Sequence, residues 1–158
     1  MSRLPALGPR GEGWFAAQLV IFVLVAAAGG SVPAWSGSAR VATGGAGVVL
    51  IGFGAWISFR GLIDLRENLT PFPAPLASGR LVDCGAYAFV RHPIYTGLIA
   101  AAFGWGLTTA TPLTLAAAAL LAVFFDLKSR REEVWLAAKY PDYDAYRHRT
   151  HKLVPWVY

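Results

Sequence analysis

Four long apolar stretches constrain the fold of this chain more than any other feature of its sequence. They cover residues 14–30, 41–59, 94–110 and 112–127. Each approaches the length of about 20 apolar residues that an α-helix needs to cross the hydrocarbon core of a bilayer. Hydrophobic residues make up 56% of the chain, which is typical of a membrane protein. The pattern therefore predicts an all-α integral membrane protein with four transmembrane helices.

Only a few residues, around positions 108–111, separate the third apolar stretch from the fourth. Such a short connection predicts a tight antiparallel hairpin of two helices, whose outer ends lie on the same side of the membrane. The chain contains no stretch typical of a flexible linker and no repeat of solenoid period. We therefore expect residues 1–158 to form a single domain.

Two polar segments complete the expected organisation, a loop at residues 60–92 and a helical C-terminal tail at residues 128–158. Together with the amino terminus they carry most of the basic residues, and Arg40 is the main exception. Since basic residues favour the cytoplasmic side of a membrane, this distribution predicts that both termini and both polar segments are cytoplasmic. The alanine- and glycine-rich composition favours a prokaryotic source, and hence the inner membrane of a bacterium.

The first apolar stretch has an alternative interpretation. Basic residues precede it and small residues follow it at 31–34, as in a cleavable secretory signal. We prefer a retained helix, because further membrane segments follow. A cleaved signal would leave the bundle with one helix fewer.

Charge and cysteine content exclude several functions. The net charge of +5 does not indicate nucleic-acid binding, because the basic residues flank the apolar stretches instead of covering one soluble face. Cys84 is the only cysteine, so the chain cannot form an internal disulfide. Three histidines and one thiol do not reach the spacing of a structural zinc site, and we expect no metal.

A charged motif stands where the polar loop meets the third apolar stretch, and it reads Arg91-His92-Pro93-Ile94-Tyr95-Thr96-Gly97. Pro93 suits the first turn of a helix, so we expect the helix to begin there, with Arg91 and His92 at its mouth. A helix amino terminus and a guanidinium group both favour an anionic ligand. In the alternative interpretation these residues only anchor the helix at the lipid head groups, with Tyr95 as an interfacial aromatic residue.

The predicted hairpin brings this motif to the same membrane face as Glu132 and Glu133 in the tail. An arginine there would bind a carboxylate, a glutamate would bind an ammonium group, and aromatic faces would attract a sulfonium. S-adenosylmethionine carries all three groups. The alternative is that Glu132 and Glu133 lie on a solvated helix face and pair with Lys128 or Arg131.

Taken together, these residues resemble the isoprenylcysteine carboxyl methyltransferase and phospholipid methyltransferase family. The resemblance covers residues 71–156. Besides the charged motif it includes the paired glutamates, Tyr143, Tyr146, Leu81-Val82, Gly85, Tyr87 and the closing Leu153-Val154-Pro155-Trp156. Ala86 is a departure, because the family often has proline after the loop glycine.

The resemblance implies a small helical membrane bundle in which the last two spans and the tail hold S-adenosylmethionine, while the acceptor arrives from the bilayer. It implies a cofactor site lined by His92, Tyr95, Gly97, Glu132, Glu133, Tyr87, Tyr143 and Tyr146. Arg91 and His92 are the expected catalytic residues, with Arg91 either meeting the acceptor or supporting the loop.

The expected function is therefore methyl transfer to the head group of a lipid-like or isoprenylated acceptor. Carboxyl O-methylation is favoured, and methylation of an amine or thiol is the alternative. A rival class is the sterol-type membrane reductase, which uses NADPH and shares a similar motif, but there asparagine commonly follows the proline where this chain has Ile94. A non-enzymatic membrane protein of the same fold is the third interpretation.

Overall fold

The computed structural model describes residues 4–155 and is built from helices. Its elements in chain order are α1 (Glu12–Ala28), α2 (Gly37–Leu65), η1 (Arg66–Asn68), η2 (Gly85–Ala88), α3 (Pro93–Thr109), α4 (Pro112–Lys139) and α5 (Tyr143–Arg149). Over the described range there is no strand, and the only extended pairing is a single bridge between Val90 and His151. The predicted all-α class is therefore confirmed.

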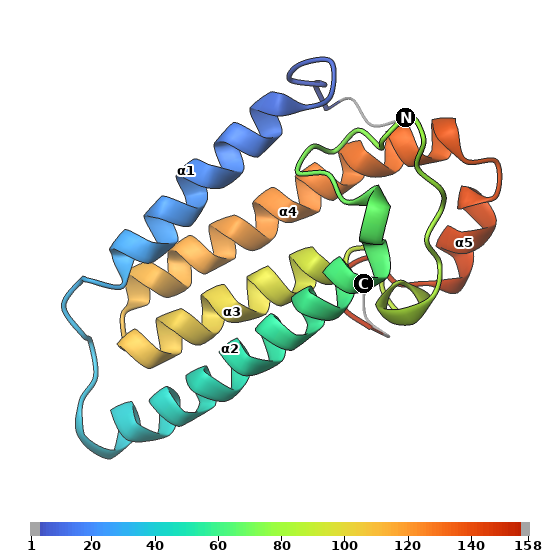
Figure 1. Ribbon diagram of the computed structural model, residues 1–158. Coiled ribbons are helices and arrows are strands. Elements are labelled where there is room, and N and C mark those ends of the chain that lie inside the picture. Colours follow the sequence, from blue (N-terminus) through green and yellow to red (C-terminus); the bar gives the residue numbers. More distant parts are fainter. Residues whose placement is uncertain (1–3, 156–158) are drawn as a thin grey trace.

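The four long helices lie side by side in the order α1, α4, α3, α2 (Figure 1). Helix α1 packs against α4, α4 against α3, and α3 against α2. Helix α5 and the loop between α2 and α3 gather at the end of this layer where α4 projects (Figure 1). Segments that are far apart in the sequence therefore meet at that end.

Helices α3 and α4 form the predicted tight hairpin. Only Ala110 and Thr111 separate them, and Ala110 adopts a left-handed conformation with a φ of 58°. Pro93 and Pro112 occupy the first turns of the two helices, where a missing N–H group costs nothing. The predicted start of α3 at Pro93 is confirmed, and the hairpin places this start beside the second half of α4.

Glycines allow α2 and α3 to approach closely. A Cβ atom added to Gly47 in α2 would lie 2.5 Å from the carbonyl oxygen of Gly104 in α3. A Cβ atom added to Gly97 in α3 would likewise clash with the carbonyl oxygen of Gly54 in α2. Larger side chains at these positions would push the two helices apart, so the glycines are required by the packing.

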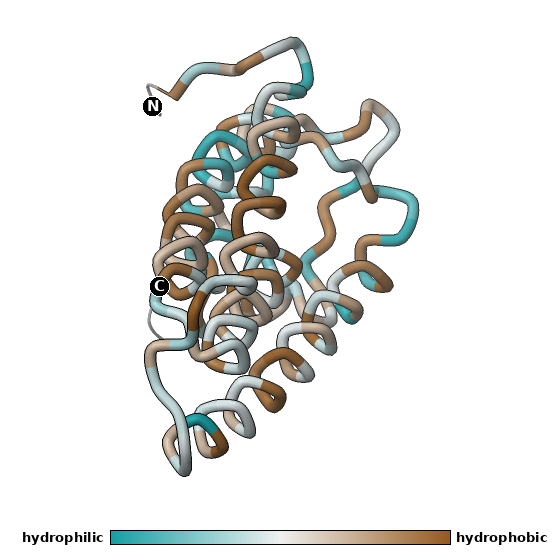
Figure 2. Tube along the Cα trace, turned by 90° about the vertical axis from the view of Figure 1, so that its left-hand side faces the viewer, coloured by the Kyte–Doolittle hydropathy of each residue, from teal (hydrophilic) through white to brown (hydrophobic). Residues whose placement is uncertain are grey.

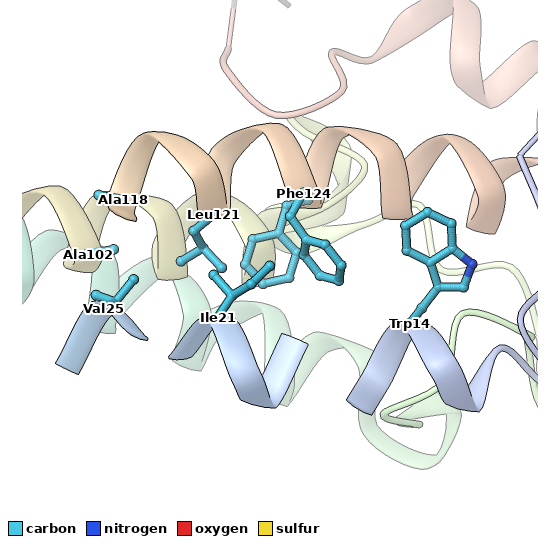
Figure 3. Close-up of a cluster of buried hydrophobic side chains, with 8 residues drawn as sticks. Trp14, Ile21, Val25, Ala102, Ala118, Leu121 and Phe124 are labelled. Atoms are coloured by element: carbon cyan, nitrogen blue, oxygen red, sulfur yellow. The ribbon is translucent and has the colours of Figure 1, made fainter. Parts of the chain in front are cut away.

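The apolar core lies mainly between α1 and α4, whose side chains point toward one another (Figure 3). It consists of Trp14, Ile21, Val25, Ala102, Ala118, Leu121, Phe124 and Phe125. Many other large apolar residues face outward, and Val20, Val23, Val41, Val48, Val49 and Trp56 are each at least 60% exposed. Hydrophobic residues run along the helices in Figure 2, whereas hydrophilic residues gather near their ends. Such an apolar outer surface suits helices that face lipid.

Two helical segments are long and apolar enough to cross a membrane, Gly37–Asn68 and Pro112–Lys139. Helices α1 and α3 have 17 residues each, which is short of the roughly 20 residues that a crossing needs. The described residues therefore give two candidate spans where the sequence predicted four. These two spans and the outward-facing apolar side chains are those of a membrane protein.

Helix α4 is longer than the sequence indicated. A separate tail was expected from residue 128 onward, but the helix continues without a break to Lys139. Residues 128–139 contain neither proline nor glycine, so nothing stops the helix until Pro141. Helix α2 similarly runs from Gly37 to Leu65, beyond the predicted 41–59. The hydrophobic pattern thus marked the apolar part of each helix and not its full length.

Candidate active site

The start of α3 is held by the segment that follows α5. Val90 and His151 form a parallel bridge, and the backbone N–H of Arg91 donates to the carbonyl oxygen of His151 at 2.8 Å. The next N–H, of His92, donates to the carbonyl oxygen of Lys152 at 3.2 Å. The backbone of the charged motif is therefore fixed by residues about 60 positions later in the chain.

Two side-chain contacts strengthen this attachment. The hydroxyl of Thr96 donates to the carbonyl oxygen of Leu153 at 2.6 Å. The ammonium of Lys152 lies 2.5 Å from Asp126 Oδ1 in α4. Burial lowers the pKa of Lys152, although its hydrogen bond and charge attraction to Asp126 oppose that effect. The segment is thereby joined to both helices of the hairpin.

Arg91 connects α3, α4 and the end of α5 through one guanidinium group. Its Nε donates to Glu133 Oε1 at 2.8 Å, and one terminal nitrogen donates to the carbonyl oxygens of Arg147 at 3.1 Å and Thr150 at 2.6 Å. The side chain is only 10% exposed. This arrangement favours the loop-supporting role among the two roles expected for Arg91.

His92 is buried between the paired glutamates. Its Nε2 lies 3.2 Å from Glu133 Oε1, and its Nδ1 lies 3.9 Å from Glu132 Oε2. Glu133 belongs to the polar part of α4, beyond the apolar stretch 112–127. Burial raises the pKa of Glu133, but hydrogen bonds and charge attraction from His92 and Arg91 outweigh it and lower the pKa to about 2. Glu133 is therefore an ionised carboxylate held by two partners.

Tyr95 forms a hydrogen bond with Glu132, as His92 does with Glu133. The Tyr95 hydroxyl donates to Glu132 Oε2 at 2.8 Å. Its ring stacks on His92 with a centroid distance of 5.4 Å, and on Phe125 with a centroid distance of 4.4 Å. The two glutamates are therefore not equivalent. Glu133 binds Arg91 and His92, while Glu132 contacts a tyrosine in the wall of a cavity.

This cavity has a volume of about 330 Å³ and lies at the polar end of the helical layer. That volume is within the range of small-molecule sites, about 300–1,000 Å³. Its wall is mostly apolar and comes from the loop 68–82 and from the ends of α1, α2, α3 and α4. His92, Tyr95 and Glu132 are among its few polar groups. An apolar wall with a few convergent polar groups is typical of a ligand site.

Three predicted tyrosines also line the cavity. Tyr146 donates from its hydroxyl to the carbonyl oxygen of Tyr87 at 2.8 Å, and its ring contacts that of Tyr143 at 5.8 Å. The buried Tyr143 hydroxyl has no hydrogen-bond partner among the described residues. Burial raises the pKa of all three phenols, so they are neutral at physiological pH. A buried hydroxyl without a partner in a cavity wall is a natural contact for a polar ligand.

A family model described as phospholipid methyltransferase matches residues 43–143, which is more than half of the chain. The chain belongs to the phospholipid methyltransferase family. The match contains both the charged motif and the paired glutamates, and it confirms the resemblance seen in the sequence. It leaves out α1 and most of the chain beyond α4. No curated protein matches the chain.

Two residues expected at the family's cofactor site do not line the cavity. Gly97 faces α2, where an added Cβ atom would clash with Ser58 and the Gly54 backbone. Glu133 reaches the cavity only through His92 and Arg91. The other expected residues, His92, Tyr95, Glu132, Tyr87, Tyr143, Tyr146 and Arg91, are all in the wall. Trp156 lies outside the described residues.

The departure from the family pattern at Ala86 has a structural explanation. Gly85 adopts a φ of 61°, which favours glycine. The backbone N–H of Ala86 then donates to Asp64 Oδ2 in α2 at 2.8 Å. Proline has no N–H group and could not make this bond. In this chain the loop is therefore attached to α2 by a contact that the common family residue excludes.

Sequence reasoning missed several polar residues of the cavity wall, among them Asn68, Thr70, Arg80 and Tyr140. Two more, Gln18 in α1 and Lys128 in α4, contact each other. Gln18 is the only polar residue in the first apolar stretch, and that interruption was the available signal. Lys128 was considered only as a possible partner of the paired glutamates on a solvated helix face. The contact between Gln18 and Lys128 joins positions 110 residues apart, which no local pattern indicates.

Proposed function

We propose that this chain is an integral membrane methyltransferase that uses S-adenosylmethionine and acts on the head group of a lipid-like or isoprenylated acceptor. The observation that carries the proposal is the cavity wall in which Tyr95 and Glu132 meet beside His92, at the polar end of apolar helices. Membership of the phospholipid methyltransferase family supports the same conclusion independently.

The cavity residues fit S-adenosylmethionine in charge and polarity. Glu132 offers a carboxylate for an ammonium or sulfonium group, and Tyr87 offers an aromatic ring. The unpartnered hydroxyl of Tyr143 would find a polar atom in the ligand. When bound, the cofactor supplies a methyl group on a sulfonium for in-line attack by the acceptor.

The remaining residues position the reacting groups. Arg91 and His92 bind Glu133 and so keep the start of α3 against α4. Tyr95 orients the carboxylate of Glu132 by its hydroxyl. The largely apolar wall excludes water, and this strengthens the electrostatic interactions inside the cavity.

A lipid-like acceptor suits a cavity surrounded by apolar helices. Phe15 of α1 and Leu62 and Leu65 of α2 line it, and both helices carry exposed apolar side chains on their outer faces. The hydrocarbon chain of the acceptor would stay in the bilayer while its head group enters the cavity. A small number of polar groups would then fix the orientation of that head group.

We favour carboxyl O-methylation over methylation of an amine or thiol. A carboxylate is nucleophilic at neutral pH, whereas an amine or thiol must first lose a proton to a base. Burial raises the pKa of Tyr143 and Tyr146, so these phenols are poor bases at neutral pH. His92 is the other candidate, but its Nε2 is already bound to Glu133.

We extend the proposal to the topology. All four long helices would cross the inner membrane of a bacterium, with both termini and the cavity on the cytoplasmic side. Support comes from the parallel arrangement of α1 and α3 beside the two longer helices (Figure 1). The basic residues of the loop 60–92 and of the tail agree with this orientation.

Calorimetric titration of the detergent-purified chain with S-adenosylmethionine tests the proposal, with NADPH as the competing ligand. We expect saturable binding of S-adenosylmethionine that is lost in Glu132→Gln and His92→Ala. Arg130→Ala is the matched control on α4, because this exposed side chain does not line the cavity. Its affinity for S-adenosylmethionine should equal that of the original chain.

Other results of this titration would assign the chain to a different class of protein. Binding of NADPH alone would place it with the sterol-type reductases, and binding of neither ligand would favour a non-enzymatic membrane protein. If correctly inserted Glu132→Gln and His92→Ala both bound S-adenosylmethionine normally, the assignment of these residues would be wrong.

A further inference from the structure

Lys128 is a buried cation in the wall of the cavity. Its residue is 1% exposed, and its ammonium donates to Gln18 Oε1 at 2.5 Å and to the carbonyl oxygen of Pro71 at 3.5 Å. The second distance is at the limit of a hydrogen bond. Among residues 4–155, no carboxylate oxygen lies within 4 Å of this ammonium.

Two other cations with little exposure, Arg91 and Lys152, have a carboxylate partner, whereas Arg131 lies over the ring of Trp135. Arg91 is paired with Glu133 at 2.8 Å, and Lys152 is paired with Asp126 at 2.5 Å. Burying an ammonium is costly unless an opposite charge compensates it. Lys128 donates hydrogen bonds only to neutral oxygens, although an ammonium carries three N–H donors. Its ammonium also lies 5.2 Å from the centroid of the Tyr95 ring, and the charge of Glu132, one turn away, attracts it. An anion in direct contact with the ammonium would complete its hydrogen bonds, and the cavity is the place from which an anion can arrive.

The surroundings of Lys128 indicate where this anion comes from. Gln18 belongs to α1, and the next two residues, Leu19 and Val20, are 47% and 60% exposed on the apolar outer surface. Phe15, one turn earlier in α1, also lines the cavity. A molecule whose hydrocarbon chain lies along this surface can place a charged head group beside Lys128.

Lys128 and Glu132 lie one turn apart on the same face of α4, and both line the cavity. Glu132 suits the positive groups of the cofactor, whereas Lys128 suits a negative group. A negative acceptor group at Lys128 would therefore lie close to the positive methyl donor. This arrangement brings the two reactants together by charge as well as by shape.

We propose that Lys128 and Gln18 form an anion-binding subsite that holds the phosphate or carboxylate group of the lipid-like acceptor. This inference rests on the proposed methyltransferase function. Lys128 supplies the charge, while Gln18 orients the ammonium through Oε1 and offers its amide N–H groups to the same anion. Gln18 lies outside the family match at residues 43–143, so the subsite adds α1 to the acceptor site.

The test uses three ten-carbon probes that differ only in the head group: decyl phosphate, decanoate and decanol. Each is titrated calorimetrically into the full chain in a non-ionic detergent, without S-adenosylmethionine. We expect at least one anionic probe to bind at least tenfold more tightly than decanol. Tighter binding of decyl phosphate would indicate a phospholipid acceptor, and tighter binding of decanoate would indicate a carboxylic acid that itself receives the methyl group.

Two variants test the residues. Lys128→Met removes the charge at nearly constant length, and Gln18→Glu places a carboxylate against the ammonium without removing it. Both should bind the anionic probes no more tightly than decanol. Arg130→Met is the control, because it removes the same charge from an exposed position on α4. It should keep the preference for anions.

S-adenosylmethionine is then titrated separately, so that the two proposals can fail independently. We expect Lys128→Met to bind it as the original chain does, and saturating S-adenosylmethionine not to displace the anionic probe. Displacement of the probe, or loss of cofactor affinity in Lys128→Met, would assign the lysine to the cofactor and overturn the inference. Unchanged probe binding in Lys128→Met would overturn it as well. A chain that binds the probe but not S-adenosylmethionine would instead contradict the proposed function.

Discussion

Arg91 satisfies three acceptors with one buried guanidinium, the carboxylate of Glu133 and the carbonyl oxygens of Arg147 and Thr150. Arg91→Ala would leave all three without this donor. Removing one member of a buried ion pair costs about 3 kcal/mol, so the midpoint of thermal unfolding in detergent should fall by several degrees.

A more exposed arginine–aspartate pair within α4 provides the control for Arg91→Ala. Arg130 lies 2.8 Å from Asp126 with a side chain that is 54% exposed, and pairs of this kind contribute about 1 kcal/mol or less. Arg130→Ala should therefore hardly change the unfolding midpoint. Equal shifts for the two variants would contradict the supporting role of Arg91.

The lowered pKa of Glu133 predicts how the stability of the fold depends on pH. His92 and Arg91 lower its pKa in the folded chain to about 2, below the ordinary value of about 4.3 in an unfolded chain. The pairing therefore stabilises the fold fully above about pH 4.3, and this contribution is lost as the pH falls through 4 toward 2. Its size is about 3 kcal/mol.

Thermal unfolding between pH 7 and pH 3 measures this contribution. The stability of the original chain should fall more steeply below pH 4 than that of Glu133→Gln, which has no carboxyl group to protonate at this position. Parallel curves would show that Glu133 does not titrate as described. Between pH 5 and pH 7 this glutamate should cause no change.

The sequence predicted which motif residues belong to the site, but it did not predict the contact between Lys128 and Gln18. Helical hairpin geometry predicted that the motif and the paired glutamates share one membrane face. The pairing of Tyr95 with Glu132 and of His92 with Glu133 comes from the structure. Lys128 and Gln18 meet across 110 residues, and their contact depends on α1 packing against α4. No spacing within the sequence contains that information.

The motif at the start of helix α3 contains residues with two different roles, lining the cavity and packing against α2. One face of its first turns carries Tyr95 into the cavity, while Gly97 faces α2. A glycine inside a cofactor motif is readily interpreted as a ligand contact. Here the space around it is filled by the backbone of another helix, so the contact it permits is between helices.

Matched substitutions on both sides of this contact test the packing role. Gly97→Ala and Gly54→Ala each introduce a Cβ atom into the facing backbone, and each should lower stability by about 1–3 kcal/mol as in other overpacked sites. Thermal unfolding and calorimetric titration with S-adenosylmethionine would be measured together. A much larger loss of affinity in Gly97→Ala than in Gly54→Ala would show that Gly97 contacts the cofactor after all.

The boundaries of α4 explain why part of the helical content was unpredictable. Its start at a proline was readable from the sequence, but its apolar pattern ends at residue 127 while the helix continues to Lys139. The extension presents Lys128, Glu132 and Leu136 at four-residue intervals to the cavity. A stretch that resembles a solvated tail is therefore part of the cavity wall.

The arrangement of the four long helices could not have been derived from hydropathy. Short connections predict only that α3 and α4 are neighbours, whereas α1 is placed by its contacts with α4, and α2 by its contacts with α3 across a long loop. Gly47 and Gly54 mark the side of α2 that packs on α3, but many glycines in apolar helices have no such partner. The helix class was predictable, and the order of the helices in the layer was not.

Cys84 is a natural reporter of the orientation of the chain in the membrane. It is the only cysteine of the sequence, and it lies exposed in the loop between α2 and α3. If this loop is cytoplasmic, a membrane-impermeant maleimide should label Cys84 only after cells are permeabilised. Labelling of intact cells at the same rate would reverse the proposed orientation.

A single cysteine engineered near Arg40 supplies the complementary measurement. In the proposed topology the connection between α1 and α2 lies on the opposite side from Cys84, so a Ser38→Cys, Cys84→Ser variant should be labelled in intact cells. If both positions reacted only after permeabilisation, α2 would not cross the membrane.

The pairing of Arg91 and His92 with His151 and Lys152 also determines when the site can form during synthesis. The helices that carry the motif and the paired glutamates are translated before residues 150–153, which leave the ribosome after them. Until then the backbone donors at the start of α3 lack their acceptors. A nascent or prematurely released chain can therefore insert into the membrane without acquiring a competent site, which limits activity to chains that are translated through this segment.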